Sequence, residues 1–195
     1  MSHPASDPIA AFREAFARAQ DHEDHDPTAM TLATVDENGR PSARMVLLKG
    51  VDERGFSFYT NLESRKGQAL AKNPYAALCI HWPKAAEQIR VEGRVELVSA
   101  EEADAYFASR VRGSQIGAWA SEQSRPLHSR EELEARVAEL TTRFEGGPVP
   151  RPPHWSGYRV IPDRIEFWFG KDSRLHDRFV YVREGAGWRC ERLHP

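Results

Sequence analysis

The sequence has little cysteine and no apolar run of membrane length. Its 195 residues include two cysteines, Cys79 and Cys190, which form no CxxC pair. Disulfide and zinc frameworks are therefore not favoured, and free thiols are typical of a reducing compartment. No apolar stretch approaches the roughly 20 residues that a membrane helix needs, and the N-terminus lacks the regions of a signal peptide. We expect a cytoplasmic protein that does not enter a membrane.

Several catalytic motifs and any excess of one charge are also missing. The chain has no GxGxxG, GxxxxGK[ST], HExxH or GxSxG, so dinucleotide folds, P-loops, zincins and α/β-hydrolases have no support. With 27 Lys and Arg against 29 Asp and Glu, the net charge of −2 argues against a nucleic-acid binder. The stretch 22–26 (HEDHD) is interpreted as an acidic loop, and no metal site is expected. Redox chemistry would need a bound organic cofactor.

The pattern along the chain predicts one domain, 1–195, with a disordered tail at 1–6. An N-capped helix is expected from Asp7 and Pro8, because Ile9, Phe12 and Phe16 follow on one stripe. Capping-box patterns at 99–102 and 129–132 predict two more helices, the second over 130–145. Strands are expected at 30–35, 41–49, 55–60, 75–82, 87–98, 155–161, 163–169, 177–183 and 187–193. This number of strands favours a closed antiparallel barrel with helices packed outside.

Cationic side chains recur in the segment 174–179 near the C-terminus. If that segment is extended, Arg174, His176 and Arg178 point to one face, which then carries no acid from the segment itself. Such a face favours an anionic ligand, because like charges about 4 Å apart repel by roughly 1 to 4 kcal/mol. The alternative is a solvated hairpin edge that discourages aggregation.

Two further segments carry paired cations. Arg44 and Lys49 flank an apolar strand but fall on opposite faces, so a bulge or two ligand groups would be needed to use both; solvated strand ends are the alternative. Arg65 and Lys66 lie near a helix start, where an anion would offset their unfavourable interaction with the helix dipole. Together with the free backbone N–H groups they would form a phosphate cradle, unless this is an ordinary surface helix.

Neutral and cationic hydrogen-bond donors also share one helical stripe. Tyr106 and Arg110 lie four residues apart, and Ser114 would share their face if the helix continues. Their phenol, guanidinium and hydroxyl groups can all donate hydrogen bonds to a phosphate, and no carboxylate among them competes for it. Gln88 and the pair Gln123–Ser124 add groups suited to the imide edge of a heterocycle.

Taken together, these segments resemble the pyridoxine (pyridoxamine) 5′-phosphate oxidase family. The resemblance is carried by RMVLLK at 44–49, FYTNLESRKGQ at 58–68, YFASRVRGSQIGAWASEQS at 106–124 and IEFWFGKDSRLHDRF at 165–179. It implies a split antiparallel β-barrel, mainly β with packed helices, that binds FMN and works as a homodimer with FMN between the subunits.

The resemblance also implies site residues. Substrate contacts fall on Lys49, Tyr106, Arg110, Ser114, Arg174, Leu175 and His176, of which Arg174 and His176 are the catalytic candidates. FMN contacts fall on Arg44, Met45, Val46, Leu47, Leu48, Lys49, Tyr59, Thr60, Arg65, Lys66, Gln88, Gln123, Ser124, Trp168 and Arg178. Trp168 and Arg178 are expected to serve the FMN held mainly by the partner chain.

The implied reaction is oxidation of pyridoxine or pyridoxamine 5′-phosphate to pyridoxal 5′-phosphate, with O2 as acceptor giving H2O2, and ammonia from the amine. His176 would either accept a proton or only position the ring. Rival interpretations are a related flavin oxidase acting on a phenazine precursor, and a non-catalytic carrier of FMN or pyridoxal phosphate.

The chain departs from the family pattern at three places. Only six residues precede Asp7, where many members carry a longer arm that covers the substrate, which puts closure by that arm in question. Glu87 stands where an Arg is common, and His194 stands where an Ala is usual. Neither change removes a mapped ligand.

Overall fold

A single antiparallel sheet organises the chain in the computed structural model, which describes residues 6–195. The tail expected at 1–6 lies, apart from Ser6, outside the described residues. The strand order is β2-β1-β5-β6-β7-β4-β3, and β8 and β9 extend from β7. Their bounds are β1 Ala29–Val35, β2 Pro41–Leu47, β3 Gly50–Asp52, β4 Gly55–Asn61, β5 Tyr75–Trp82, β6 Glu87–Leu97, β7 Trp155–Phe169, β8 Asp177–Glu184 and β9 Gly187–Leu193.

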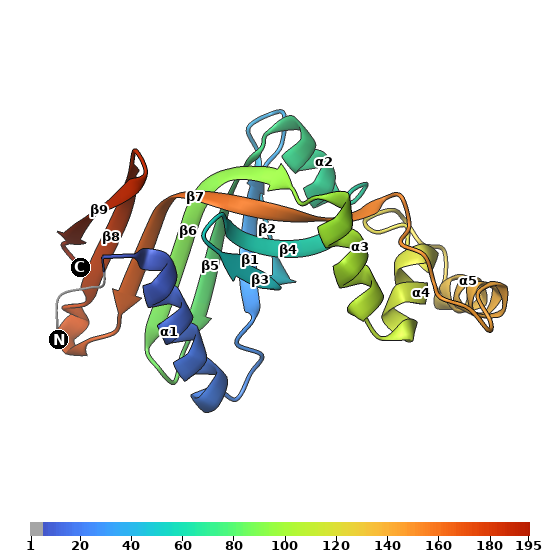
Figure 1. Ribbon diagram of the computed structural model, residues 1–195, viewed down its shortest axis with the longest axis horizontal. Coiled ribbons are helices and arrows are strands. Elements are labelled where there is room, and N and C mark those ends of the chain that lie inside the picture. The colour runs from blue at the N-terminus through green and yellow to red at the C-terminus, as the bar shows by residue number, and fades with distance from the viewer. Residues whose placement is uncertain (1–5) are drawn as a thin grey trace.

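The sheet curls into the split antiparallel barrel that the sequence led us to expect (Figure 1). Its path ends at β2 and β3, so the closed barrel favoured by the strand count is an open, curled sheet instead. The hairpin of β1 and β2 is confirmed, and so are β4, β5 and β6 within one or two residues. The short strand β3 was not predicted.

The strand β7 is the branch point of the sheet. Its first half pairs with β4, its second half pairs with β8, and β6 pairs with it from Tyr158 to Phe169. The sequence suggests two strands, 155–161 and 163–169, and Pro162 lies between them. The strand nevertheless continues, since Pro162 pairs with Gly93 where the register shifts, and a missing backbone N–H is tolerated at a bulge.

The first helix, α1 (Pro8–His22), begins where its cap predicts. The Asp7 carboxylate accepts a hydrogen bond of 2.9 Å from the Ile9 N–H, which satisfies a free donor of the first turn. Phe12 is fully buried, with its ring centroid 4.9 Å from that of Phe56 and 6.0 Å from that of Trp82. The apolar stripe of α1 therefore packs on the main core of the sheet.

The remaining helices are α2 (Arg65–Lys72), α3 (Ala100–Ser109), α4 (Arg112–Ala120) and α5 (Arg130–Arg143), with a 3-10 turn at Asp172–Arg174. The capping box of Ser99 and Glu102 is confirmed, and the Ser129 side chain caps α5. A second, smaller core of Phe107, Ile116, Val149 and Trp155 lies beneath α3, α4 and α5. Figure 1 shows these helices at one end of the long axis and the β8–β9 hairpin at the other.

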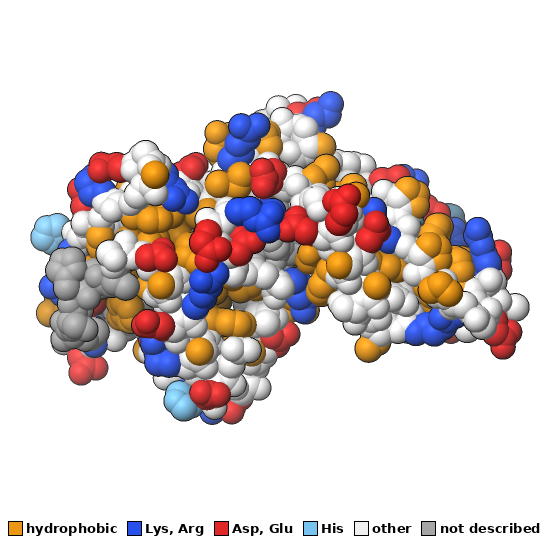
Figure 2. Space-filling model, viewed as in Figure 1, with side chains coloured by type: hydrophobic (Ala, Val, Ile, Leu, Met, Phe, Trp, Pro, Cys, Tyr) orange, Lys and Arg blue, Asp and Glu red, His pale blue; other side chains and the backbone are white. Residues whose placement is uncertain are grey.

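Charged side chains of both signs are mixed on the surface, as the nearly neutral composition predicts. On the face in Figure 2, basic and acidic side chains are interspersed across the middle of the molecule. Among residues 6–195, no helix is long and apolar enough to cross a membrane. In the same range, no group of three or more His, Cys, Asp or Glu side chains is placed to hold a metal ion.

The bulge between β6 and β7 leads to a prediction about stability. A Cβ added at Gly93 would lie 2.0 Å from the carbonyl oxygen of Ile161, so the backbone would have to move. We expect Gly93→Ala to lower the free energy of unfolding by about 1 to 3 kcal/mol, measured by urea denaturation. Gly113→Ala is the matched control, because nothing lies within 4 Å of its added Cβ. Equal stability of Gly93→Ala and wild type would contradict this packing.

Candidate functional site

A pocket of about 410 Å³ opens between the sheet and the helical end of the molecule. It gathers residues that are distant in sequence, from β2, β4, α2 and the α3–α4 region. Eleven of the predicted site residues line it: Met45, Val46, Leu47, Lys49, Tyr59, Thr60, Lys66, Tyr106, Arg110, Ser114 and Gln123. Val111 and Trp155 complete the lining.

Lys66 is a buried cation held by neutral oxygens. Its Nζ donates to Thr60 Oγ1 at 3.0 Å, to Gln123 Oε1 at 2.9 Å and to Ser64 Oγ at 3.3 Å. Burial, with a smaller effect of the Arg44 charge, lowers the pKa of Lys66 to about 8. Because a desolvated ammonium without a carboxylate is unfavourable, an anionic ligand would stabilise its charged form.

Arg110 is a second cation with unused donors. It follows α3 directly, and its guanidinium carbon lies 4.9 Å from the ring centroid of Trp155 and 5.7 Å from that of Phe107. Its Nη1 is buried and makes no hydrogen bond to any residue from 6 to 195. Burial lowers the pKa of Arg110, although it remains charged at neutral pH. A buried donor without an acceptor is costly, and an anion in the pocket would satisfy it.

The helix carrying Tyr106 does not continue to Ser114 as the spacing suggested. Helix α3 ends at Ser109 and α4 begins at Arg112, so the three predicted residues do not share one stripe. They still line the same pocket because the chain turns between the helices. The Gln115 amide stabilises this turn by donating to the carbonyl of Phe107 at 3.0 Å, near the C-terminus of α3.

Three nearly parallel aromatic rings form one wall of the pocket. The Tyr59 centroid lies 3.9 Å from that of Tyr106 and 5.5 Å from that of Trp155, with interplanar angles of 20° and 12°. Burial raises the pKa of the Tyr106 phenol, so it remains a donor at neutral pH. The sequence motifs did not identify Trp155 as a pocket residue and placed it only at the start of a strand. Its contact with Arg110 depends on tertiary packing and left no local signal.

Arg44 and Lys49 face two different pockets, because residues five apart point to opposite faces of a strand. Arg44 lines a neighbouring cavity of about 330 Å³ together with Arg65. The Arg44 guanidinium donates to Thr34 Oγ1 at 2.9 Å and to Ser42 Oγ at 2.7 Å, again neutral oxygens. No bulge is needed to use both cations, because each has its own cavity.

Two further FMN contacts predicted from the same segments, Leu48 and Ser124, line neither of these cavities. The Leu48 side chain is buried in the main core, and its N–H donates to the Thr28 carbonyl. Ser124 is exposed in the turn after Gln123 and has a positive φ of 75°. Their side chains therefore do not line the pocket.

A second group of predicted residues lies on β6, β7 and β8. Gln88, Trp168 and Arg178 occupy one row across the three strands. The carboxylate of Glu166, which is only 2% exposed, accepts from Arg178 Nε at 2.8 Å, and this ion pair raises the pKa of Arg178. Arg178 Nη1 donates to the His194 carbonyl at 2.9 Å. Because that contact uses the backbone, it does not depend on the side chain at 194.

The predicted alternation along 174–178 is wrong for its first half. Ser173 and Arg174 have positive φ angles of 57° and 60°, and β8 begins only at Asp177. Arg174, His176 and Arg178 therefore do not form one extended face. The His176 ring lies 4.5 Å from that of Trp168, and its Nδ1 accepts from the Lys171 N–H at 3.2 Å. Together with Leu175, His176 lines a third cavity of about 360 Å³.

Within one chain the two groups are separated. Tyr106 and Arg110 belong to the end of the molecule that holds α3, whereas Arg178 and His176 belong to the end that holds β8 (Figure 1). Glu87, which departs from the family pattern, lies next to Gln88 of the second group. Its two carboxylate oxygens accept from Arg18 Nη2 of α1 at 3.1 and 3.3 Å. The two groups therefore do not form one site within a single chain.

The curled sheet and its cation-lined pocket define a split-barrel protein. A family model described as pyridoxamine 5′-phosphate oxidase matches residues 17–144, and one described as pyridoxine 5′-phosphate oxidase C-terminal dimerisation region matches residues 155–195. The chain belongs to the pyridoxamine 5′-phosphate oxidase family, as the motifs led us to expect.

Similar proteins agree with this assignment. A pyridoxine/pyridoxamine 5′-phosphate oxidase of Myxococcus xanthus is 64% identical over 97% of this chain and 92% of that protein. One of Rhodospirillum rubrum is 60% identical over 97% of this chain and 96% of that protein. The crystal structure of PhzG from Burkholderia lata, in complex with tetrahydrophenazine-1-carboxylic acid, has 35% identity and a TM-score of 0.93, covering 98% and 94% of the two chains.

Lys66 allows a direct test of the pocket's electrostatics. Its lowered pKa predicts an ammonium that titrates near pH 8 in the ligand-free protein, whereas an exposed lysine titrates near 10.4. A bound anion favours the charged form, so affinity for the anion is greatest below pH 8 and falls as the pH rises through 8. NMR of lysine-labelled protein would measure the midpoint, and Lys66→Arg would identify the signal. A midpoint above 10 would contradict the described burial.

Proposed function

We propose that this protein oxidises pyridoxine 5′-phosphate or pyridoxamine 5′-phosphate to pyridoxal 5′-phosphate, with FMN as its cofactor. O2 takes up the two electrons and two protons and becomes H2O2, and the amine substrate also consumes water and releases ammonia. The whole chain, 1–195, would form one oxidase domain. The free thiols of Cys79 and Cys190 support a cytoplasmic setting.

The observation that carries the proposal is the donor set around Arg110. Lys49, Tyr106, Arg110 and Ser114 line one pocket, and the buried Nη1 of Arg110 lacks an acceptor. A phosphate monoester carries about two negative charges and three acceptor oxygens, which fits these donors. The aromatic wall beside them suits a planar ring.

The remaining cations fit a second phosphorylated ring. Among the described residues, Arg44 and Lys66 donate only to neutral oxygens. Arg65 lines the cavity of Arg44, which the carboxylates of Asp36 and Glu37 also line. Thr60 and Gln123 hold the Lys66 ammonium toward the pocket and would keep it in place for an anion. These residues would hold FMN, which when bound supplies the two-electron redox chemistry of the reaction.

A homodimer with FMN at the subunit interface would complete the site. Gln88, Trp168 and Arg178 lie away from the main pocket in their own chain, and the region 155–195 matches a dimerisation model. Large apolar side chains near the pocket are exposed, including 62% of Met45 and 74% of Val111. A second copy would cover this surface and bring its own Trp168 and Arg178 to the cofactor.

The hydrogen bond to His176 favours one of its two roles. Because Nδ1 accepts from a backbone N–H, the neutral imidazole carries its proton on Nε2 and would donate from that atom. A ring nitrogen that already bears a proton is not a base. We propose that His176 and Arg174 hold the pyridine ring of the substrate through donated hydrogen bonds and orient its reacting carbon.

A flavin oxidase acting on a phenazine precursor is the second candidate, because PhzG is similar in structure. Such a substrate lacks a phosphate and would leave the donors of Lys49 and Arg110 unpaired. The relatives that share 56–64% of their residues with this chain carry the pyridoxine/pyridoxamine name. Both arguments favour pyridoxine or pyridoxamine 5′-phosphate as the substrate.

Aerobic assay of the purified protein for aldehyde and peroxide tests the proposal. We expect turnover of pyridoxine 5′-phosphate but far less of pyridoxine. Arg110→Met should lower kcat/KM for the phosphate by about 10- to 100-fold, since a hydrogen bond to a charged group contributes about 1.5 to 3 kcal/mol. Arg130→Met, which breaks an exposed pair with Glu134, is the control and should leave kcat/KM unchanged.

Three outcomes would count against these assignments. Equal rates with pyridoxine and its phosphate would favour the phenazine-type oxidase. Flavin that stays oxidised on anaerobic mixing with substrate would favour a carrier. Wild-type turnover and KM in both Arg174→Ala and His176→Ala would remove the ring-holding role.

A further inference from the structure

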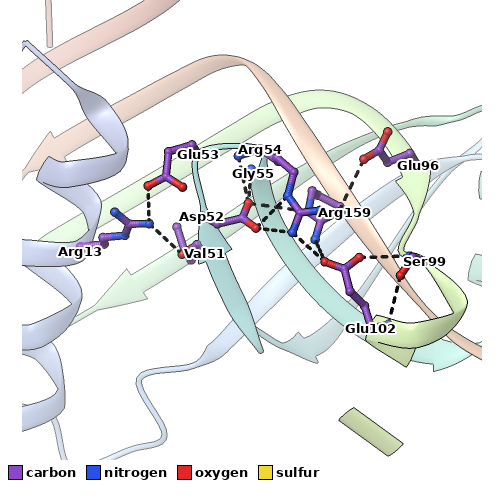
Figure 3. Close-up of polar contacts among 10 residues, drawn as sticks. All are labelled: Arg13, Val51, Asp52, Glu53, Arg54, Gly55, Glu96, Ser99, Glu102 and Arg159. Carbon is purple, nitrogen blue, oxygen red and sulfur yellow. Dashed lines mark hydrogen bonds and ion pairs between the residues drawn. The ribbon is translucent and has the colours of Figure 1, made fainter. Parts of the chain in front are cut away.

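A buried arginine outside the pocket joins the helical end to the sheet. Arg159 of β7 is only 4% exposed, and its guanidinium faces three carboxylates (Figure 3). The N–O distances are 2.9 Å to Glu102, 3.6 Å to Glu96 and 3.8 Å to Asp52. A buried cation keeps its position only while it is paired, so these acids hold Arg159 in place.

Glu102 is the central acid of this network. Its Oε2 accepts from the Ser99 N–H at 3.1 Å and completes the capping box of α3. Its Oε1 accepts from Arg159 at 2.9 Å and from Arg54 at 2.7 Å. These contacts lower the pKa of Glu102 to about 2, so it is charged at every pH at which the protein works. One carboxylate thus ties the first turn of α3 to β7 and to the β3–β4 turn.

The orientation of α3 determines where two pocket residues lie. Tyr106 is four residues after Glu102 and therefore lies one helical turn further along the same side, and Arg110 follows the helix. Ala103 and Phe107 are the buried residues of α3, and Phe107 anchors the helix in the smaller core. The ion pair of Glu102 at the first turn adds a polar restraint on α3, as does the pair of Asp104 with Arg151.

The same stretch of β7 also places the ring against which Tyr106 stacks. A Cβ at Gly157 would lie 2.7 Å from ring atoms of Tyr59, so the absence of a side chain allows Tyr59 to lie across β7. Tyr59 then stacks on Tyr106 at 3.9 Å. Arg159, two residues along the strand, holds the helix that carries the other ring.

We infer that Glu102 and Arg159 are positioning residues for the phosphate pocket, acting through α3 on Tyr106 and Arg110. Neither residue lines the pocket, so they act without touching a ligand. The inference rests on the proposed function for the identity of the ligand, a phosphorylated pyridine. It concerns how the pocket is held in shape, not which reaction follows.

Glu102→Gln tests this inference because the amide oxygen can still cap α3 while the negative charge is lost. We expect KM for pyridoxine 5′-phosphate to rise by roughly tenfold to a hundredfold, with kcat at saturation within about twofold of wild type. Affinity for pyridoxal 5′-phosphate should fall by a similar factor, while affinity for pyridoxal changes little. Arg159→Met should behave alike, and Arg159→Lys, which keeps the charge, should recover part of the loss.

Glu53→Gln is the matched control, because Glu53 forms an exposed ion pair with Arg13 beside the network (Figure 3). It should leave KM, kcat and both affinities unchanged. If Arg159→Met does not fold, Glu102→Gln decides alone. Unchanged KM and affinity in Glu102→Gln would overturn the inference, and so would equal losses for pyridoxal and its phosphate. Failure of the proposed function would give a different result: neither wild type nor Glu53→Gln would turn over the substrate.

Discussion

Buried positive charge without a carboxylate partner is the constraint on which the pocket depends. Lys66 donates to three neutral oxygens, and the buried Nη1 of Arg110 has no acceptor among residues 6–195. The chain as a whole is nearly neutral, so this charge is local and is not a consequence of composition. Since desolvated cations are unfavourable unless they are paired, the folded chain is most stable with an anion in this place. A phosphorylated ring, the ligand proposed above, would satisfy the donors and the aromatic wall together.

The branched strand β7 connects this constraint with the rest of the molecule. Its first residues carry Trp155, Gly157 and Arg159, which shape the pocket and hold α3. Its last residues carry Glu166 and Trp168, which lie beside Arg178 at the other end of the molecule. The two ends of one strand thus support two groups of site residues that a single chain keeps apart. The family match over 155–195 is to a dimerisation region, which supports the proposed association of two copies.

Local chemistry made much of the fold predictable. Asp7 and Ser99 cap their helices as their neighbours in sequence suggest, and the β1–β2 hairpin follows from alternation and a Gly turn. The long motifs also indicated the residues that converge on the main pocket. Features that depend on distant partners were missed. Pro162 does not end β7 because Gly93 faces it across a bulge, and the helix breaks after Ser109 where Gln115 can bind its last turn. The left-handed backbone at Arg174 and the ion pair of Glu102 with Arg159 likewise have no local signal.

Binding of riboflavin 5′-phosphate and of riboflavin to the purified, flavin-free protein tests the central claim most directly. Quenching of flavin fluorescence gives both dissociation constants under the same conditions. If unpaired cations define the pocket, the phosphorylated flavin binds at least about tenfold more tightly, and the difference shrinks in Lys66→Met. Equal affinity for the two flavins would contradict the account, because the phosphate would then contribute nothing to binding.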